Sequence, residues 1–445
     1  MKPTFIISCP IDTYSGYGAR GRDVAKAIIE LDKYDVKILP QRWGATPWGF
    51  IEDHEEDWGF LTKHFFYPQP NQQYPKPDIW MQITIPNEFM PQGHYNIGVT
   101  AGIESTVAPA DWIVGCNRMN LILGSSKHTI DVLKNSQFEK KDDRTQQTIE
   151  HIKFNPNIKT DILFEGLKTE VYKPTTNILD LPEIKESFCF LFVGHWIQGD
   201  FGHDRKNVGL LIKSFLETFK NQARQPALIL KTTQGSISYM DRDSILKKIN
   251  VIKKTVKGKL PKIYLIHGDL LDEEMNQLYN HPKIKCMVSL TKGEGFGRPL
   301  LEFTQSKKPI ITTGWSGHVD FLKPDMSILL PGTLGDVHPS AQNKWLIQGS
   351  KWFDVDTMAL GKALKDMYKN YKDYVHRARQ QRNYCKENFS FEKMKESLNQ
   401  LLKEKVVEAP KQVPLQLPKL KKIKDGNSQI ETPQLKLPKL KKVKI

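Results

Sequence analysis

Two glutamates flank a glycine-rich stretch in the second half of the chain. Glu294 and Glu302 stand eight positions apart, and Gly295, Phe296 and Gly297 follow the first of them directly. Glycines allow a tight turn and a close approach of the backbone to a ligand. Paired carboxylates near such a turn could contact a ligand's hydroxyl groups or stabilise developing positive charge. The alternative from spacing alone is a surface glutamate that complements a helix dipole.

The elements around this stretch decide where the two carboxylates lie. Residues 286–290 are an apolar run typical of a buried parallel strand, Pro299 suits the first position of a helix, and residues 310–313 form the next strand. We expect Glu302 in the first helical turns and Glu294 in the loop. Both then face the crevice beyond the carboxyl ends of the strands, where open α/β sheets bind ligands.

A second polar cluster follows a strand expected over residues 189–193. Gly194 and His195 come directly after this strand, and Arg205 and Lys206 precede a helix. Cations at a helix N-terminus oppose the helix dipole, so the pair favours a bound anion such as a diphosphate. A solvated basic loop is the alternative interpretation.

The first half of the chain has two weaker signals. Gly16, Gly18 and Gly21 match the dinucleotide pattern G-x-G-x-x-G, but several residues separate them from the preceding strand. We therefore expect a glycine loop that faces a ligand cleft. Glu104 follows a strand at 95–100 and either faces the cleft or caps the next segment, and both interpretations stay open.

Strand and helix patterns alternate along the chain, which predicts parallel α/β domains. The pattern restarts near residues 163–167, so we expect two halves with a ligand cleft between them. Residues 41–77 and 135–160 are expected to be loops. The expected strands cover 4–9, 36–39, 78–83, 95–100, 121–124, 189–193, 227–231, 263–266, 286–290 and 310–313, and the expected helices cover 19–31, 127–134, 209–219, 244–251 and 273–279.

Length and composition agree with two soluble-type domains. At 445 residues the chain exceeds what one core usually supports, and no apolar run approaches the 18 or so residues of a membrane span. The first 18 residues predict a strand rather than a signal peptide. The five cysteines are far apart, without CxxC or zinc-type spacing. These features predict a cytoplasmic protein without a structural metal.

The net charge of +15 is concentrated in the last 41 residues, which carry +8 of it. The mildly basic remainder weakens a nucleic-acid interpretation. The tail repeats Leu-Pro-Lys-Leu-Lys-Lys-Ile/Val-Lys at 417–424 and 437–444. One interpretation is a disordered, solvated tail. The other is two-point attachment to an anionic membrane surface, with nucleic acid or an acidic protein as further partners.

Taken together, these motifs resemble retaining glycosyltransferases of the GT-B fold, in particular glycosyltransferase family 4 (group 1). Residues 294–302 look like that family's E-x7-E signature, and 192–194 with 205–207 resemble its phosphate-binding segment. Residues 164–167 resemble its interdomain linker, and 388–391 the start of its final helix, which crosses back to the first domain. The resemblance is strongest in the second half of the chain.

The resemblance implies a domain plan. Two Rossmann-like, doubly wound domains would face a central cleft, with a basic C-terminal tail. We expect an acceptor-side domain at 1–165, a nucleotide-sugar donor domain at 166–385, a crossover helix at 386–404 and a disordered tail at 405–445.

It also implies residue roles. Glu294 would lie beside the transferred sugar, Glu302 would bind the donor's ribose hydroxyls, and Arg205 would supply the charge that relatives often place at the position of His195. The implied catalytic residues are Glu294, Lys206 and Glu104. The implied donor-binding residues are Glu302, Arg205, Gly295, Phe296, Gly297, Gly194 and His195, and the implied acceptor or phosphate loop contains Gly16 and Gly18.

The predicted function is transfer of a hexose, with retention, to a glycan, lipid-linked or protein-linked acceptor. The co-substrate would be a nucleotide sugar such as UDP- or GDP-hexose, with no metal or cofactor. The enzyme would be cytoplasmic, with attachment to a membrane surface as an option. The alternatives are a glycosyltransferase acting on nucleic-acid bases and a non-enzymatic carbohydrate- or anion-binding protein of the same fold.

Overall fold

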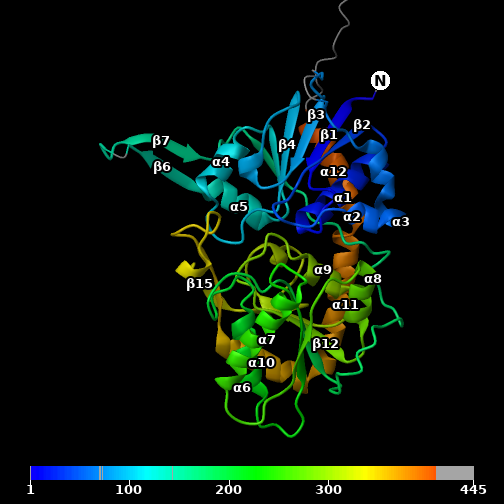
Figure 1. Ribbon diagram of the computed structural model, residues 1–445, viewed down its shortest axis with the longest axis vertical. Helices are drawn as coiled ribbons and strands as arrows, with labels where there is room; N and C mark the ends of the chain where they lie inside the picture. Colours follow the sequence, from blue (N-terminus) through cyan, green and yellow to red (C-terminus); the bar gives the residue numbers. More distant parts are fainter. Residues whose placement is uncertain (1, 70–71, 73, 143, 407–445) are drawn as a thin grey trace, which may run out of the picture. The chain divides into compact units, whose positions relative to one another are not determined.

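Two six-stranded sheets organise the chain (Figure 1). The computed structural model describes residues 2–69, 72, 74–142 and 144–406. The first sheet has the strand order β2-β1-β3-β4-β5-β8 and the second the order β11-β10-β9-β12-β13-β14. Every neighbouring pair in both sheets is parallel. The predicted α/β class with two Rossmann-like sheets is confirmed, and the predicted basic tail lies outside the described residues.

The first half supplies the first sheet and its helices. Its elements in chain order are β1 (Thr4–Cys9), α1 (Gly16–Glu30), β2 (Asp35–Pro40), α2 (Phe50–Asp53), α3 (Glu55–Trp58), the 3-10 turn η1 (Gly59–His64), β3 (Ile79–Ile83), η2 (Pro86–Glu88), β4 (Tyr95–Thr100), α4 (Ala110–Cys116), β5 (Leu121–Gly124), α5 (Lys127–Asn135), β6 (Gln137–Lys141), β7 (Thr148–Lys153) and β8 (Lys159–Ile162).

The second half supplies the second sheet. Its elements are β9 (Cys189–Val193), α6 (Val208–Phe219), β10 (Ala227–Lys231), α7 (Tyr239–Lys254), β11 (Ile263–Ile266), α8 (Asp272–Asn280), β12 (Ile284–Ser289), α9 (Arg298–Thr304), β13 (Ile310–Thr313), η3 (Gly317–Asp320), β14 (Ile328–Leu330), β15 (Gly332–Asp336), η4 (Pro339–Ala341), β16 (Lys351–Val355), α10 (Thr357–Lys369), α11 (Tyr371–Asn388) and α12 (Phe391–Lys405).

Apolar strands explain why both sheets are parallel and central. All residues of β4 and β5 are buried, as are four of the five in β9. Strands covered by helices on both faces read as continuous apolar runs, and that is the pattern found here. The edge strand β11 is less deeply buried, with four residues of intermediate exposure.

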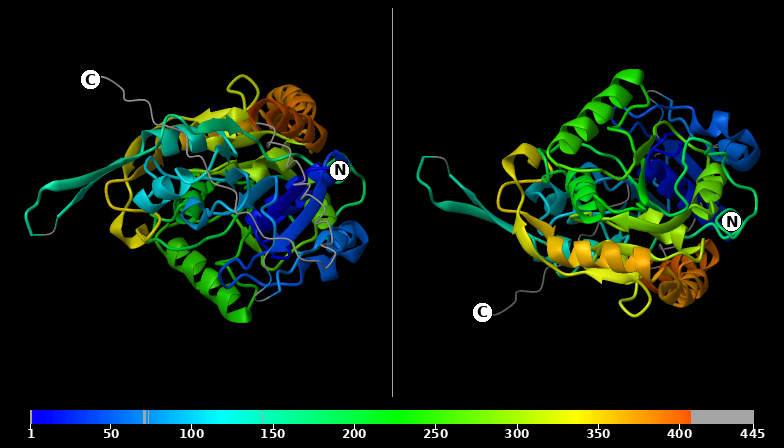
Figure 2. Two further views of the ribbon diagram at one scale, coloured as in Figure 1. Left: turned by 90° about the horizontal axis from the view of Figure 1, so that it is seen from above. Right: turned by 90° about the horizontal axis from the view of Figure 1, so that it is seen from below.

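Two segments expected to be loops contain regular structure, so that expectation is wrong. Within 135–160, β6 and β7 pair as an antiparallel hairpin and β8 joins the edge of the first sheet. The hairpin is nearly all polar and exposed, so no alternation of apolar residues marks it. It extends away from the two sheets in both views of Figure 2. Residues 41–77 contain α2, α3 and η1.

Helix α12 ends the described chain by packing on the first half. Met394, Leu398 and Leu401 are buried among β1, β2 and α1 side chains, and α12 lies beside α1 in Figure 1. Its N-cap is Ser390, whose hydroxyl accepts a hydrogen bond from Lys393 N at 3.3 Å. No helix in the described ranges is both long and apolar enough to cross a bilayer.

Candidate active site

The loop that carries Glu294 is held by backbone contacts on both sides. It leaves β12 and enters α9 through Gly297, whose φ of 99° lies in the left-handed region that favours glycine. The Glu294 N–H donates to the Ser316 hydroxyl at 2.9 Å, and the Gly317 N–H donates to the Glu294 carbonyl at 2.9 Å. The position of this carboxylate is therefore fixed by the loop after β13.

Three of the expected catalytic side chains lie together. The Glu294 carboxylate, 7% exposed, forms an ion pair with Lys206 Nζ and lies 3.3 Å from Arg205 Nη1. Arg205 Nη1 is also 3.5 Å from Glu104 Oε1. Glu104 therefore faces this cluster rather than capping the segment after it. We call Glu104, Arg205, Lys206 and Glu294 the ionic cluster.

Charge coupling sets the protonation of the ionic cluster. Burial alone would raise the pKa of Glu294, but Lys206 and Arg205 outweigh it and lower that pKa to about 2. Burial lowers the pKa of Lys206, and the neighbouring Arg205 lowers it further. Glu294 is thus an anion at neutral pH, held between two cations.

The glycines of the loop let the two halves of the chain touch. A Cβ on Gly293 would lie 2.0 Å from the Glu104 carbonyl oxygen, and one on Gly295 would lie 2.4 Å from that of Ala101. In addition, Ser125 Oγ donates to the Gly295 carbonyl at 3.1 Å. These glycines therefore allow a close approach, as expected, but in this structure the backbone they approach is the segment after β4.

Phe296 contributes to the core rather than to an open surface. Its ring is 3% exposed and packs on Phe321 with centroids 5.1 Å apart. Any contact of this residue with a donor would consequently come from its backbone.

Glu302 belongs to a different network from Glu294. Its carboxylate accepts a hydrogen bond from the Tyr279 hydroxyl at 3.4 Å. Burial raises the pKa of Glu302 to about 8, and the nearby Asp272 adds to the shift. Asp272 is itself bound by Lys168 Nζ at 2.8 Å. The two carboxylates of the E-x7-E stretch therefore differ in charge state near neutral pH.

Gly194 and His195 lie against the lysine of the ionic cluster. A Cβ on Gly194 would be 3.3 Å from Lys206 Cε, which leaves little room for another residue there. The His195 Nδ1 lies 2.9 Å from Thr233 Oγ1. Desolvation of the ring lowers the pKa of His195, and the positive charges of Lys206 and Arg205 lower it further.

The expected glycine loop is the first turn of a helix. α1 begins at Gly16 rather than Ala19, because Ser15 caps it by accepting a hydrogen bond from Gly18 N at 2.9 Å. A Cβ on Gly18 would lie 2.4 Å from the Thr13 carbonyl oxygen, whereas Gly16 has open space around it. The predicted helix start at residue 19 is wrong, because the pattern of glycines does not reveal that Ser15 is the N-cap.

Two site residues were missed by sequence reasoning. The Tyr17 hydroxyl lies 2.9 Å from Thr100 Oγ1 and accepts from Ala101 N at 3.1 Å. Arg298 Nη2 binds Asp23 at 2.7 Å. Both join α1 to segments near the ionic cluster. Tyr17 lies within the glycine pattern and Arg298 within the 294–302 stretch, but both stand at variable positions of these motifs, so the motifs do not mark them.

His318, in the 3-10 turn η3 after β13, is fully buried beside this loop. Its Nε2 lies 2.6 Å from the Thr313 carbonyl, and its Nδ1 has no hydrogen-bond partner among the described residues. A Cβ on Gly297 would be 3.1 Å from that of His318, a tight contact that adds to the preference of this position for glycine. Across the described ranges, no three His, Cys, Asp or Glu side chains are arranged to hold a metal ion.

Comparison with known proteins supplies the fold's identity. No protein-family model matches the sequence, and no curated protein matches it either. Solved structures do match. A glycosyltransferase from Rickettsia africae superposes with a TM-score of 0.59 at 13% identity, over 92% of this chain and 100% of that one.

Two further matches agree. Anabaena Alr3699/HepE in complex with UDP-glucose gives a TM-score of 0.59 at 12% identity, over 90% of this chain and 99% of that one. Sucrose-phosphate synthase from Thermosynechococcus elongatus gives a TM-score of 0.56 at 13% identity, over 91% of this chain and 98% of that one. The chain has the GT-B fold. The expected resemblance to GT-B glycosyltransferases is confirmed at the level of the fold.

Proposed function

We propose that this protein is a retaining glycosyltransferase that moves a hexose from a nucleotide sugar to an acceptor hydroxyl. The observation that carries the proposal is the ionic cluster, a buried carboxylate paired with two cations at the carboxyl ends of the second sheet's strands. Open α/β sheets bind ligands at this edge. Cations there suit a diphosphate, and the carboxylate suits a sugar that develops positive charge.

A diphosphate that binds at the ionic cluster would have to displace Glu294 from its cations. Two cations and two carboxylates make the cluster formally neutral when no ligand is bound. A donor diphosphate would compete with Glu294 for Lys206 and Arg205. Glu294 would then be released as an anion beside the sugar, where an oxocarbenium-like transition state gains from negative charge. The bond from the sugar carbon to the diphosphate oxygen breaks, a bond from the acceptor oxygen to the same carbon forms, and the acceptor's proton passes to the leaving nucleoside diphosphate.

The donor we propose to test first is UDP-glucose. The Anabaena protein was solved with UDP-glucose. An E. coli protein that superposes with a TM-score of 0.54 at 11% identity, over 90% of this chain and 99% of that one, was solved with UDP-2-fluoro glucose. Both likenesses are structural, so GDP-hexoses stay in the test. Glu302, in its partly buried network with Tyr279, is the proposed partner of the ribose hydroxyls.

Metal independence and a membrane-side acceptor belong to the same proposal. The donor charge would be met by Lys206 and Arg205 without a metal ion. The repeated basic tail suggests a cytoplasmic enzyme that works at an anionic membrane surface on a lipid-linked or other glycan acceptor.

Donor hydrolysis is the test. The full chain is incubated with UDP-glucose, UDP-galactose, UDP-N-acetylglucosamine and GDP-mannose, with and without EDTA, and free nucleoside diphosphate is measured. We expect one donor to be hydrolysed in the presence of EDTA. Glu294→Gln and Lys206→Ala should each lower the rate of this hydrolysis at least tenfold. Exposed Glu273→Gln and Lys247→Ala serve as matched controls. No hydrolysis of any donor, with or without added Mg²⁺, would favour the non-enzymatic binder.

A further inference from the structure

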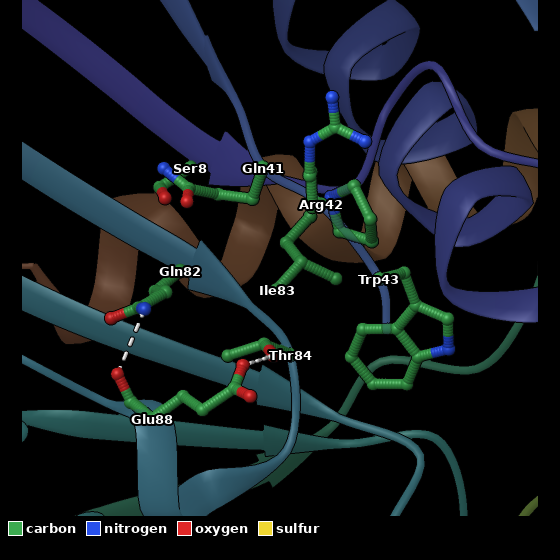
Figure 3. Close-up of a pocket in the computed structure, with 9 residues that line it drawn as sticks. Ser8, Gln41, Arg42, Trp43, Gln82, Ile83, Thr84 and Glu88 are labelled. Atoms are coloured by element: carbon green, nitrogen blue, oxygen red, sulfur yellow. Dashed lines mark hydrogen bonds between the residues drawn. The ribbon is translucent and has the colours of Figure 1, made fainter. Parts of the chain in front are cut away.

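A cavity of about 350 Å³ opens at the carboxyl ends of β1, β2 and β3, within the first half of the chain (Figure 3). Its volume lies within the range of about 300–1,000 Å³ that is usual for small-molecule sites. Its lining includes none of the ionic cluster, so the donor site proposed above does not account for it. The lining residues used below are Ser8, Gln41, Arg42, Trp43, Gln82 and Glu88.

The cavity is lined by groups that both donate and accept hydrogen bonds. Ser8 is 2% exposed, and its hydroxyl makes no hydrogen bond to any described residue. Arg42 forms no ion pair within the described ranges, although its guanidinium carbon lies 5.7 Å from the Trp48 ring centroid. Gln41 adds an amide that can do both. These groups are free to bind a ligand.

The opposite wall is rigid. Gln82 Nε2 donates to the Glu88 carbonyl at 2.9 Å, and Gln82 Oε1 accepts from Met90 N at 2.9 Å. The Glu88 carboxylate is held by the Thr84 hydroxyl, as Figure 3 shows. One wall therefore presents a fixed carboxylate acceptor. Arg42 lines another part of the cavity, with its guanidinium directed away from Glu88 in Figure 3.

Trp43 supplies a flat apolar surface beside these polar groups. Its indole packs on the Tyr17 ring with centroids 4.4 Å apart and an interplanar angle of 33°. A sugar ring needs this combination: its hydroxyls both donate and accept, and its C–H face packs on an aromatic ring. A phosphate would meet the Glu88 carboxylate as well as Arg42, so the lining offers it no net positive charge, and a long acyl chain would leave the polar groups unpaired.

The cavity is linked by contacts to the Glu294 loop. Trp43 packs on Tyr17, whose hydroxyl accepts a hydrogen bond from Ala101 N. The Ala101 carbonyl in turn lies where a Cβ on Gly295 would be 2.4 Å away. The cavity is thus connected, through Tyr17 and Ala101, to the loop that carries Glu294 of the ionic cluster.

We propose that this cavity binds a sugar residue of the acceptor, which makes the acceptor a glycan or glycoside rather than a bare lipid or a protein side chain. Only the identification of the bound sugar as part of an acceptor rests on the proposed function. The sugar-binding part stands without it, because it depends on the cavity alone.

The test measures binding of simple sugars directly. The full chain is titrated with methyl α- and β-glycosides of glucose, galactose, mannose and N-acetylglucosamine, by saturation-transfer NMR and tryptophan fluorescence, with and without UDP. We expect at least one glycoside to bind and Trp43→Ala and Arg42→Leu each to weaken it at least tenfold. UDP binding should be unchanged in both variants. Tyr239→Ala, at an 85% exposed aromatic residue, is the control.

The outcomes separate this inference from the proposed function. No binding of any glycoside, binding that both variants keep, or displacement of the glycoside by inorganic phosphate overturns the sugar pocket. Glycoside binding that depends on Trp43 and Arg42 supports it even if no nucleotide sugar is hydrolysed, and in that case only the proposed transfer reaction fails. If Trp43→Ala does not fold, Arg42→Leu decides alone, since Arg42 is exposed.

Discussion

Glu294 neutralises two cations that are otherwise held close together in the protein. In Glu294→Gln, Lys206 and Arg205 keep Glu104 as a nearby carboxylate but lose their buried partner. Removing one partner of a buried pair costs about 3–5 kcal/mol. We expect a lower thermal midpoint for the variant, and a larger rise on adding UDP than in the natural protein, because the diphosphate replaces the lost charge.

Thermal unfolding of both proteins, with and without millimolar UDP, checks this expectation. Glu273→Gln on the exposed face of α8 is the control and should behave as the natural protein does. An equal or smaller UDP-induced shift in Glu294→Gln would show that the diphosphate does not meet these cations.

Glu302 predicts a pH dependence of stability. Its pKa rises from 4.5 to about 8, chiefly through burial. Between these values the folded protein keeps a proton that the unfolded chain has released, so the group destabilises the fold progressively as pH rises. Glu302→Gln lacks this effect. The midpoint of the variant minus that of the natural protein should therefore grow from pH 5 to pH 8 and level off above it.

Midpoints measured at five or six pH values from 5 to 9 test this. The same series with Glu273→Gln should give a flat difference. A flat difference from pH 5 to pH 9 would instead mean that Glu302 is ionised in the folded state throughout this range, as it is in the unfolded chain.

At the scale of the element, apolar runs were readable from the sequence and polar ones were not. The strand at 189–193 and the helix beginning near residue 208 were predicted because burial on both faces demands continuous apolar residues. The hairpin β6–β7 was missed because it is exposed on both faces, so apolar and polar residues do not alternate along its strands. In the site, local motifs identified the loop of Glu294. The pairing of Glu104 with Arg205 depends on a contact across 101 positions, which no local pattern contains.

The loop from Gly293 to Gly297 makes a prediction about its packing. Gly295→Ala places a methyl group 2.4 Å from the Ala101 carbonyl oxygen. Overpacking of this kind costs about 1–3 kcal/mol. We expect a lower urea midpoint with an unchanged slope, because the denatured state is the same.

Gly361→Ala is the matched control for this variant. Gly361 lies inside α10, with its nearest atom at 3.7 Å from a built Cβ, so alanine should stabilise the helix by roughly 0.5–1 kcal/mol. If Gly295→Ala were as stable as the natural protein, the approach of the loop to Ala101 would not be close in solution.

At the scale of the molecule, Arg298 ties the second half of the chain to the first. Its guanidinium binds Asp23 of α1 at 2.7 Å and Glu165 of the connecting segment at 2.9 Å. Arg298→Met would leave both carboxylates without their cation. We expect the free energy of unfolding, measured with urea, to fall by about 3–5 kcal/mol. Arg242→Met, at an exposed arginine, should change it little. Similar midpoints for the two variants would contradict a fixed connection through Arg298.

The basic tail makes the last prediction, which rests on the sequence because residues 407–445 lie outside those described. Each lysine near an anionic surface contributes about 1 kcal/mol, so the lysines of one repeat bind marginally and the two repeats bind usefully together. Lys405 stays in every variant, because its carbonyl accepts hydrogen bonds from Tyr95 and Lys159, which hold the end of α12.

We expect the full chain to bind phosphatidylserine vesicles at low salt and to lose binding as salt is raised. A chain ending at Val406, and a full chain with the repeat lysines changed to glutamine, should both fail to bind. The second variant keeps the length of the tail and so isolates its charge. Vesicle binding that persists in the glutamine variant would assign attachment to the folded part. DNA binding that only the full chain shows, without vesicle binding, would instead make the tail a nucleic-acid contact.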